Sequence, residues 1–191
     1  LTDLVIDLTV VEDWQTILRL GEWKATVAVF DGHEVIAIWP GFKDRVMGLA
    51  VDVGSTTIAA HLCDLASGNV LASSGMMNPQ IRFGEDLMSR VSYVMMHPDG
   101  VVQMADAVRS AICTLVEQVC LEAEVDAHDI LDSTFVGNPV MHHLLLGLSP
   151  VELGVAPFAL ATDESVRLRA SELDLSFHPG ARAYTLPCIA G

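Results

Sequence analysis

Residues 48–57 read Gly48-Leu49-Ala50-Val51-Asp52-Val53-Gly54-Ser55-Thr56-Thr57, and this is the most informative stretch of the 191-residue chain. An apolar strand ends on an acidic residue, and a glycine and three hydroxyl side chains follow. Asp52 at the end of a buried strand can face a cleft and hold a hydrated Mg²⁺, which prefers one or two carboxylates plus waters. Gly54 lets the backbone approach a phosphate closely. The next N–H groups and hydroxyls can donate to phosphate oxygens; the hydroxyls belong to Ser55, Thr56 and Thr57.

The same stretch has a plainer interpretation as a β-hairpin. In that interpretation Gly54 serves only the turn, and the threonines serve only β-propensity. The flanking sequence favours phosphate binding, because the stretch lies between two apolar strands at residues 47–52 and 56–62. A second turn at residues 64–69 leads to a third strand at residues 70–74. We therefore predict a three-stranded antiparallel meander whose first turn binds phosphate.

The rest of the chain predicts helices and further strands behind this meander. Apolar residues at helical spacing indicate a helix around residues 87–95 and a long amphipathic helix from about residue 98 to 119. A short strand at residues 133–136 precedes a helix at residues 140–146, and residues 183–186 form a further strand. This order is that of one lobe of a ribonuclease H-like fold. We therefore predict an α/β fold for this part.

Residues before the meander form a small β-rich module of their own. A strand is predicted at residues 4–10, and a second pair of strands at residues 24–30 and 33–39. Asp31-Gly32 between that pair is a strong hairpin signal, because both turn residues must reach positive φ. The predicted domains are residues 1–45 and residues 46–191.

Composition excludes several classes of protein. The net charge of -15 repels the phosphate backbone of nucleic acids. Apolar residues make up 51% of the chain and mean hydropathy is +0.44, so the chain has enough apolar side chains to fold. Neither an uninterrupted apolar stretch of membrane-spanning length nor a signal peptide is present. We therefore expect a cytoplasmic protein that binds neither nucleic acid nor membrane.

Cysteines and histidines give no metal-binding pattern in the sequence. The cysteine spacing matches neither a zinc site nor an iron–sulfur run, so we expect reduced thiols. His142 and His143 are adjacent on a predicted helix, so they point in different directions and cannot act as an i,i+4 metal pair. We expect one of them to be packed and the other to be solvated. The four cysteines are Cys63, Cys113, Cys120 and Cys188.

Residues 48–57 resemble the first phosphate motif of the acetate and sugar kinase, heat-shock chaperone and actin superfamily. Within that superfamily, the chain most resembles the reductive activators of corrinoid proteins. Residues before about 46 resemble, more weakly, the middle linker domain of those activators. The other matching segments follow in order along the chain: Asn78-Pro79-Gln80, Phe83-Gly84-Glu85-Asp86, Ser89-Arg90, Gly137-Asn138, residues 141–147, Ala156-Pro157-Phe158 and residues 186–191.

The resemblance implies the first lobe of an actin-like ATPase. The resemblance also implies an activity. Activators of this kind couple hydrolysis of ATP, with Mg²⁺, to the uphill reduction of cob(II)alamin to cob(I)alamin on a corrinoid protein. The electron enters through a two-iron, two-sulfur ferredoxin domain, which we expect outside this chain because no cysteine run is present. The chain begins at Leu1 without Met and ends after an apolar run, so we expect a fragment. Its second phosphate motif and adenosine motif would lie beyond Gly191, and the fragment alone is expected to be inactive.

The resemblance makes Asp52 and Asp86 the candidate catalytic carboxylates, with Asp52 also holding Mg²⁺ through water. Asp86 either enters the cleft or favours a helix N-terminus through the helix dipole. It also lies four residues before Arg90, which predicts a modest surface ion pair. Gly137 and Asn138 either face the nucleotide or form a turn at a strand end. The candidate phosphate-binding residues are Gly54, Ser55, Thr56, Thr57, Gly137 and Asn138.

Two other functions remain open beside ATP-dependent corrinoid activation. A small-molecule kinase on the same fold would transfer the γ-phosphoryl group to a metabolite, although this half of the chain supplies no obvious sugar-binding cluster. A non-catalytic, chaperone-like module would use the N-terminal hairpin for dimerisation. The expected partners are a corrinoid protein and a second copy of the chain, joined through the N-terminal module.

Overall fold

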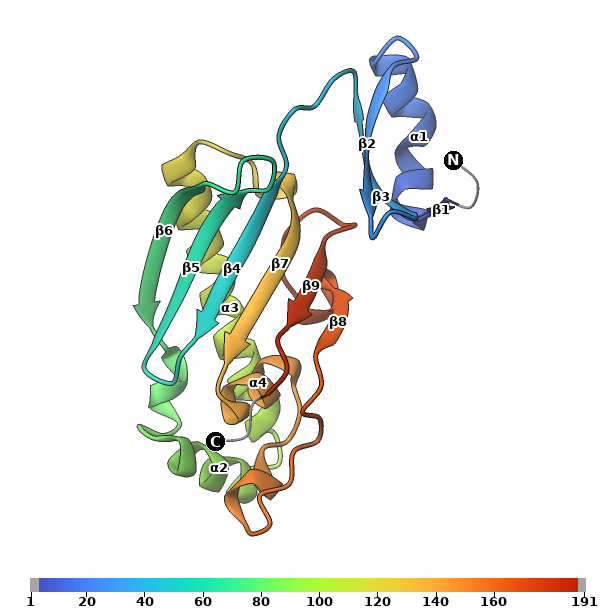
Figure 1. Cartoon of the computed structure of the whole chain (residues 1–191). Helices are drawn as coiled ribbons and strands as arrows, with labels where there is room; N and C mark the ends of the chain where they lie inside the picture. Colours follow the sequence, from blue (N-terminus) through green and yellow to red (C-terminus); the bar gives the residue numbers. More distant parts are fainter. Residues whose placement is uncertain (1–3, 189–191) are drawn as a thin grey trace.

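The computed structural model describes residues 4–188 and has a larger and a smaller part (Figure 1). The larger part is a six-stranded sheet, and the smaller, N-terminal part is a three-stranded sheet with one helix. The end of the last matching segment, residues 189–191, lies outside the described residues. The α/β class predicted from the sequence is confirmed.

The larger sheet has the strand order β6-β5-β4-β7-β9-β8. Its first three strands form the predicted antiparallel meander, and β7 and β9 run parallel to β4. This is the order of a ribonuclease H-like lobe, with β8 added antiparallel at the edge. Strand β8 was not predicted from the sequence, although Val-Arg-Leu-Arg alternates between apolar and charged residues as a strand does. The strands are β4 (Met47–Val53), β5 (Thr57–Asp64), β6 (Val70–Met77), β7 (Ile130–Gly137), β8 (Val166–Arg169) and β9 (Arg182–Thr185).

Helix α3 (Gly100–Ala123) crosses one face of this sheet and contacts β5 and β6 (Figure 1). Burial of each large apolar side chain on its inner face stabilises the fold by roughly 1.5–3 kcal/mol. Helix α4 (Pro139–Leu146) packs beside α3, and α2 (Leu87–Met96) lies beyond the end of the sheet (Figure 1). The fully buried side chains of α3 are Met104, Val108, Ile112, Leu115 and Val119.

The N-terminal part contains a helix that the sequence analysis missed. The predicted strand at residues 4–10 is wrong beyond β1 (Val5–Ile6), because α1 (Leu8–Leu20) begins two residues later. The Asp7 carboxylate accepts a hydrogen bond from the Thr9 N–H at 3.0 Å and caps the helix. The apolar face of α1 then packs on β3, so tertiary contacts override the β-propensity of the Thr-Val-Val run.

The small sheet itself has the order β1-β3-β2. Strands β2 (Ala25–Phe30) and β3 (Glu34–Pro40) form the predicted hairpin, and both Asp31 and Gly32 have positive φ. With three strands and one 13-residue helix, this part is a mixed α/β module rather than a purely β-rich one. Short 3-10 turns complete the chain at Pro79–Arg82, Ala127–Asp129, Val151–Gly154 and Ala170–Leu173.

A buried carboxylate joins the two parts. The Asp7 side chain is 0% exposed, and its Oδ2 lies 3.1 Å from the Arg182 guanidinium and 2.9 Å from that of Arg169. Arg182 also pairs with Glu34 at 2.7 Å, so the hairpin is fixed to β9 as well. Burial alone would raise the pKa of Asp7, but the hydrogen bonds from Thr9 and Arg182 outweigh it and lower that pKa.

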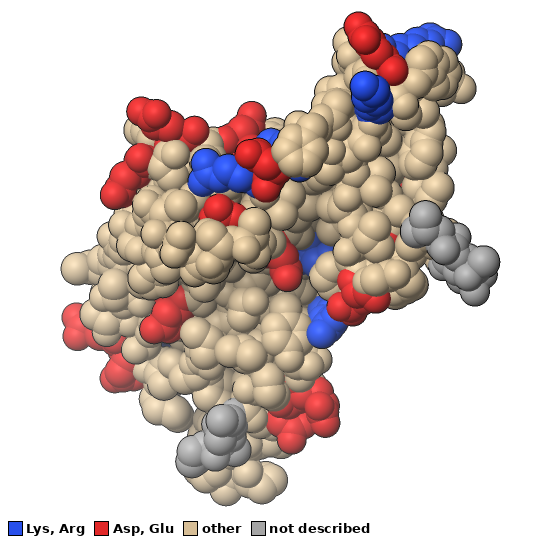
Figure 2. Space-filling view, turned by 45° about the horizontal axis from the view of Figure 1, so that its top comes forward, with Lys and Arg blue, Asp and Glu red and all other residues tan. Residues whose placement is uncertain are grey.

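Acidic side chains are spread over the face of the larger part seen in Figure 2, and basic ones are few. This face therefore offers no basic stripe that would follow a nucleic-acid backbone. Among residues 4–188, no helix combines the length and the apolar character needed to cross a lipid bilayer.

Replacing Asp7 with asparagine should lower the free energy of unfolding at pH 7 by about 3 kcal/mol, because Arg169 and Arg182 lose their shared anion. The folded-state pKa of Asp7 lies below its unfolded value. Its contribution is therefore present above the unfolded pKa and is lost as the pH falls through the folded pKa. Urea unfolding of both proteins from pH 7 downward should show a difference that shrinks below about pH 4.

Asp31→Asn is the matched control, since it removes the exposed pair with Arg167 and should cost less than about 1 kcal/mol. An Asp7→Asn loss no larger than this control would contradict the joining role of Asp7.

Candidate functional site

The structure brings the two predicted phosphate segments to one edge of the large sheet. In the parallel pairing of β4 with β7, Asp52 lies opposite Val136 and Val53 lies opposite Gly137. The turn after β4 and the turn after β7 therefore leave the sheet side by side (Figure 1). Ligands of open α/β sheets bind outside the carboxyl ends of parallel strands, so this edge is the candidate site.

Asp52 is the free carboxylate at this edge. It is exposed at the end of β4, on the sheet face away from α3. Among residues 4–188 it forms no ion pair and no side-chain hydrogen bond. A carboxylate without protein partners at a strand end suits a water-mediated Mg²⁺, because the metal keeps most of its hydration shell.

Both glycines of the site are required by close approach of the backbone. A Cβ on Gly54 would lie 2.5 Å from the carbonyl oxygen of Thr57, so the turn itself demands glycine. A Cβ on Gly137 would lie 2.9 Å from the carbonyl oxygen of Val53. Gly137 therefore lets the two turns lie against one another. The turn role proposed as the plainer interpretation of Gly54 is real, and it is compatible with phosphate binding.

Three completely buried polar side chains lie beneath the first turn, and we call Asn78, Gln80 and Arg90 the loop clamp. The Asn78 amide donates to the carbonyl oxygen of Gly54 at 2.8 Å. The Arg90 guanidinium donates to the carbonyl oxygen of Ser55 at 2.5 Å. The clamp thus pulls two consecutive carbonyl groups of the turn into the protein interior.

The clamp fixes the direction of the N–H groups in the turn. Because a trans peptide unit is planar, its N–H points opposite to its C=O. Inward carbonyls at Gly54 and Ser55 therefore turn the N–H groups of Ser55 and Thr56 away from the clamp. Within the described part of the chain, neither N–H donates to a protein acceptor. Successive free N–H groups beside hydroxyl side chains form an anion-binding nest.

Arg90 corrects one prediction made from the sequence. A surface ion pair with Asp86 was expected, but Arg90 is 0% exposed. Its Nε donates to the carbonyl oxygen of Gly84 at 2.9 Å, and a terminal nitrogen lies 3.3 Å from Gln80 Oε1. Burial lowers the pKa of the Arg90 guanidinium, and the charge of Asp86 opposes that shift. The clamp residues lie in the Asn78-Pro79-Gln80 and Ser89-Arg90 segments that resemble the corrinoid activators. The sequence alone, however, assigned no function to these three side chains.

Asp86 and Asn138 both cap helices. Asp86 Oδ1 accepts the Ser89 N–H at 2.7 Å at the start of α2, and this hydrogen bond lowers the pKa of Asp86. Asn138 Oδ1 accepts the Met141 N–H at 3.1 Å at the start of α4. Asp86 thus lies at a helix N-terminus, as its second interpretation expected, and Asn138 caps α4 within the turn that was the second interpretation for that residue. Only Asn138 lies in a turn that pairing places beside Asp52.

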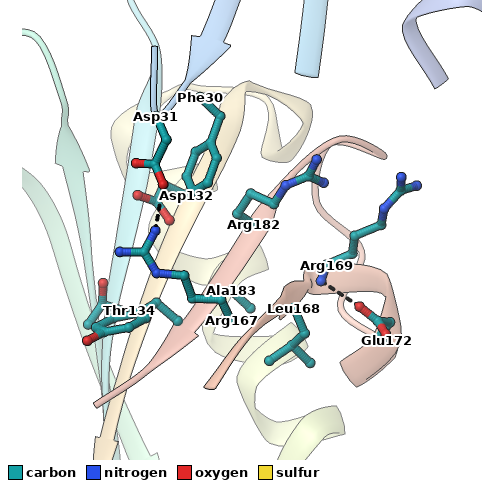
Figure 3. A pocket seen from close by; sticks show the side chains of 11 residues that line it. Phe30, Asp31, Asp132, Thr134, Arg167, Leu168, Arg169, Glu172, Arg182 and Ala183 are labelled. Atoms are coloured by element: carbon teal, nitrogen blue, oxygen red, sulfur yellow. Dashed lines mark hydrogen bonds and ion pairs between the residues drawn. The ribbon is translucent and has the colours of Figure 1, made fainter. Parts of the chain in front are cut away.

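A pocket of about 360 Å³ lies away from this edge, between the hairpin and strands β8 and β9 (Figure 3). Figure 3 shows Arg167 reaching Asp31, and the pair is 2.8 Å apart. Arg169 and Arg182, which also line the pocket, are paired with Asp7. The arginines therefore hold the two parts of the chain together, and the pocket is part of that junction.

His142 and His143 also differ from the sequence prediction. One of them was expected to be solvated, but His142 is 4% and His143 0% exposed. Both lie on the side of α4 that packs inside the lobe. The four cysteines are free thiols, as expected; Cys120 and Cys188 are buried, and Cys63 and Cys113 are half-buried.

Comparison with known proteins gives the family. Residues 47–191 match the sequence profile of the RACo middle region, and residues 1–45 match that of the RACo linker region. The chain belongs to the RACo family. It is 28% identical over 187 residues to "Corrinoid activation enzyme RamQ" of Eubacterium limosum, covering 97% of this chain and 32% of RamQ.

A solved RACo-type structure has the same fold. The "Reductive activator for corrinoid,iron-sulfur protein" is 34% identical, with a TM-score of 0.86 over 98% of this chain and 30% of that chain. The resemblance to corrinoid activators is therefore confirmed, and the shared fold agrees with the predicted ribonuclease H-like first lobe. This chain spans about a third of the length of both relatives.

Stability measurements on Arg90→Lys and Asp52→Asn should distinguish the loop clamp, which holds the turn in place, from the residues that face the proposed ligand. Lysine keeps the charge, but its single nitrogen cannot reach the three separated acceptors that the guanidinium fork spans, so buried carbonyls are left unpaired at roughly 1–3 kcal/mol each. Chemical denaturation should show a loss of about 3 kcal/mol for Arg90→Lys. Asp52→Asn should change stability by less than about 0.5 kcal/mol, because Asp52 has no protein partner.

Arg82→Lys is the control, because it makes the same arginine-to-lysine change at an exposed position. Equal stability of the Arg90 and Arg82 variants would refute the clamp.

Proposed function

We propose that the whole protein couples ATP hydrolysis to reductive activation of a corrinoid protein, returning cob(II)alamin to cob(I)alamin. Membership of the RACo family and the names of its relatives support corrinoid activation. The turn geometry supports the ATP-dependent step. The observation that carries this step is the pair of inward carbonyls at Gly54 and Ser55, which leaves two N–H groups free for phosphate oxygens.

Each candidate residue has a role in this proposal. Asp52 holds Mg²⁺ through bridging water and so places the metal next to the bound phosphates. The free N–H groups, together with the hydroxyls of Ser55, Thr56 and Thr57, donate to phosphate oxygens. Gly137 and the backbone N–H of Asn138 belong to the second turn, on the other side of the proposed phosphate site. Asp86 supports α2 as a helix cap, and we propose no direct part for it in hydrolysis.

The remaining chemistry belongs to the rest of the whole protein. The second lobe would close over the nucleotide and bind adenosine. A two-iron, two-sulfur domain would deliver the electron, since the cysteines of this chain are too scattered to hold a cluster. Hydrolysis would then drive the conformational change that makes the uphill electron transfer favourable. Free thiols suit the reducing cytoplasm, where we place the protein.

The test is ATP hydrolysis by the full-length protein, with and without a cob(II)alamin-loaded corrinoid protein and a reductant. Asp52→Asn should lower the turnover number by on the order of 100-fold, because the metal loses its carboxylate. Asp86→Asn should keep most activity, because asparagine still caps the helix. The appearance of the cob(I)alamin spectrum reports the coupled electron transfer.

Three results would overturn parts of this proposal. Hydrolysis indifferent to the corrinoid protein, with transfer of phosphate to an added metabolite, would establish a small-molecule kinase. Full activity of Asp52→Asn would remove the metal role of Asp52. Absence of hydrolysis under every condition would leave a non-catalytic module.

We also propose that the N-terminal module forms a homodimer. Strand β2 is at the edge of its sheet, so its outer backbone groups are free to pair with another strand. Its Val27 and Val29 side chains are 41% and 40% exposed, and the nearby Trp23 is 76% exposed. An unpaired edge strand with exposed apolar side chains suits a twofold contact with a second copy.

Light scattering should give twice the monomer mass for the 191-residue chain and the monomer mass for Val27→Lys, because a charge on the edge blocks strand pairing. Val102→Lys is the control, since Val102 is 60% exposed on α3, away from this edge. A monomeric parent chain, or a Val27→Lys dimer, would refute the proposal.

A further inference from the structure

A buried cluster outside the phosphate site contains two imidazoles and a thiol. One ring nitrogen each of His142 and His143 and the sulfur of Cys188 all lie within 4.8 Å of one another. The three residues are 4%, 0% and 9% exposed. The histidines come from α4, and the cysteine follows β9. Elements distant in the sequence thus bring three soft or borderline donors to one point inside the lobe.

The hydrogen bonds of His143 fix which of its nitrogens is free of a proton. Its Nδ1 lies 2.7 Å from the carbonyl oxygen of Pro139, and a carbonyl can only accept, so Nδ1 carries the proton. Its Nε2 therefore has a lone pair and accepts the Ala161 N–H at 3.0 Å. Metal-ligating histidines are oriented in this way, with the other ring N–H donated to a backbone carbonyl.

His142 supplies an unpaired polar atom. Its Nε2 lies 3.0 Å from the Thr185 hydroxyl, whereas its buried Nδ1 has no hydrogen-bond partner among the described residues. A buried ring nitrogen without a partner is destabilising, and such atoms are rare in folded proteins. Burial, followed by the neighbouring His143, lowers the pKa of His142, and this direction favours the neutral imidazole that ligates metals.

We propose that His142, His143 and Cys188 form a binding site for a borderline-soft divalent cation of the Zn²⁺ type. Two neutral imidazoles and one thiolate make a donor set that such a cation prefers over Mg²⁺ or Ca²⁺. The unpaired Nδ1 of His142 gains a ligand bond. The Nε2 of His143 exchanges its contact with the Ala161 N–H for the metal. Three protein ligands leave a fourth position for water or for another group.

Binding has a defined proton balance. Cys188 must lose its thiol proton to ligate the cation as a thiolate, so one proton is released for each cation bound. The affinity for the cation therefore rises with pH over the range in which the thiol is protonated.

The proposed cation site uses none of the proposed phosphate-binding residues, but it shares helix α4 with the second turn of the candidate phosphate site. His142 is one helical turn from Asn138, and the backbone N–H of His142 donates to the Asn138 carbonyl oxygen at 2.9 Å. A cation there would tie the segment after β9 to α4, and so would support the second turn of the phosphate site. Loss of the cation is therefore expected to loosen that turn without removing Asp52 or the loop clamp.

Co²⁺ is the probe, because a thiolate ligand gives it a near-ultraviolet charge-transfer band. The 191-residue chain, carrying no histidine tag, is titrated with Co²⁺ and then with Zn²⁺ as competitor. We expect one equivalent to produce the band, one proton to be released, and Zn²⁺ to abolish the band. Cys188→Ser and His142→Gln should weaken binding about tenfold or more. Cys120→Ser is the matched control, since Cys120 is also buried but lies in α3, and it should bind normally.

A second readout keeps the proposal falsifiable if a variant folds poorly. In the parent chain, Zn²⁺ should slow alkylation of Cys188 at least several-fold, leave alkylation of Cys113 unchanged and raise the unfolding temperature. Absence of the charge-transfer band, equal affinity in the Cys188 and Cys120 variants, or unchanged alkylation of Cys188 would each show that the cluster is ordinary packing.

Discussion

A buried guanidinium organises the edge of the sheet on which the proposed function depends. Arg90 is completely buried, and no carboxylate pairs with it among the described residues. A buried charge is costly unless hydrogen bonds replace its hydration. Carbonyl groups of Ser55 and Gly84 and the Gln80 side chain supply them. The need to satisfy one cation thus brings the turn after β4, the segment before α2 and the first turn of that helix into one arrangement.

A second buried charge, the Asp7 carboxylate, also holds separate segments together, at the opposite end of the large sheet. Asp7 caps α1 and pairs with Arg169 and Arg182, so a single carboxylate both starts a helix and joins two modules. Figure 1 places this junction at the amino ends of the parallel strands and the candidate site at their carboxyl ends. The N-terminal module can therefore serve as a fixed attachment without covering the candidate site.

The two proposed binding sites share α4. Its capped N-terminus follows the turn after β7, which belongs to the proposed phosphate site, and its buried face carries the two histidines of the proposed cation site. The Asn138 side chain caps α4 and so fixes the residue at which this helix begins. Residues that hold backbone in place, rather than residues that would touch ligand, thus make up most of the described site.

Local patterns in the sequence determined the meander, the long helix α3, the hairpin at Asp31-Gly32 and the composition of the phosphate turn. Strict apolar periodicity and a turn dipeptide act over a few residues, so they can be identified without tertiary contacts. Only the tertiary structure decided that residues 8–20 are helical, that Arg90 is buried and that His142 meets Cys188. Each of these depends on partners far away in the chain, because burial and hydrogen-bond satisfaction are set by what packs against a side chain, not by its neighbours in sequence.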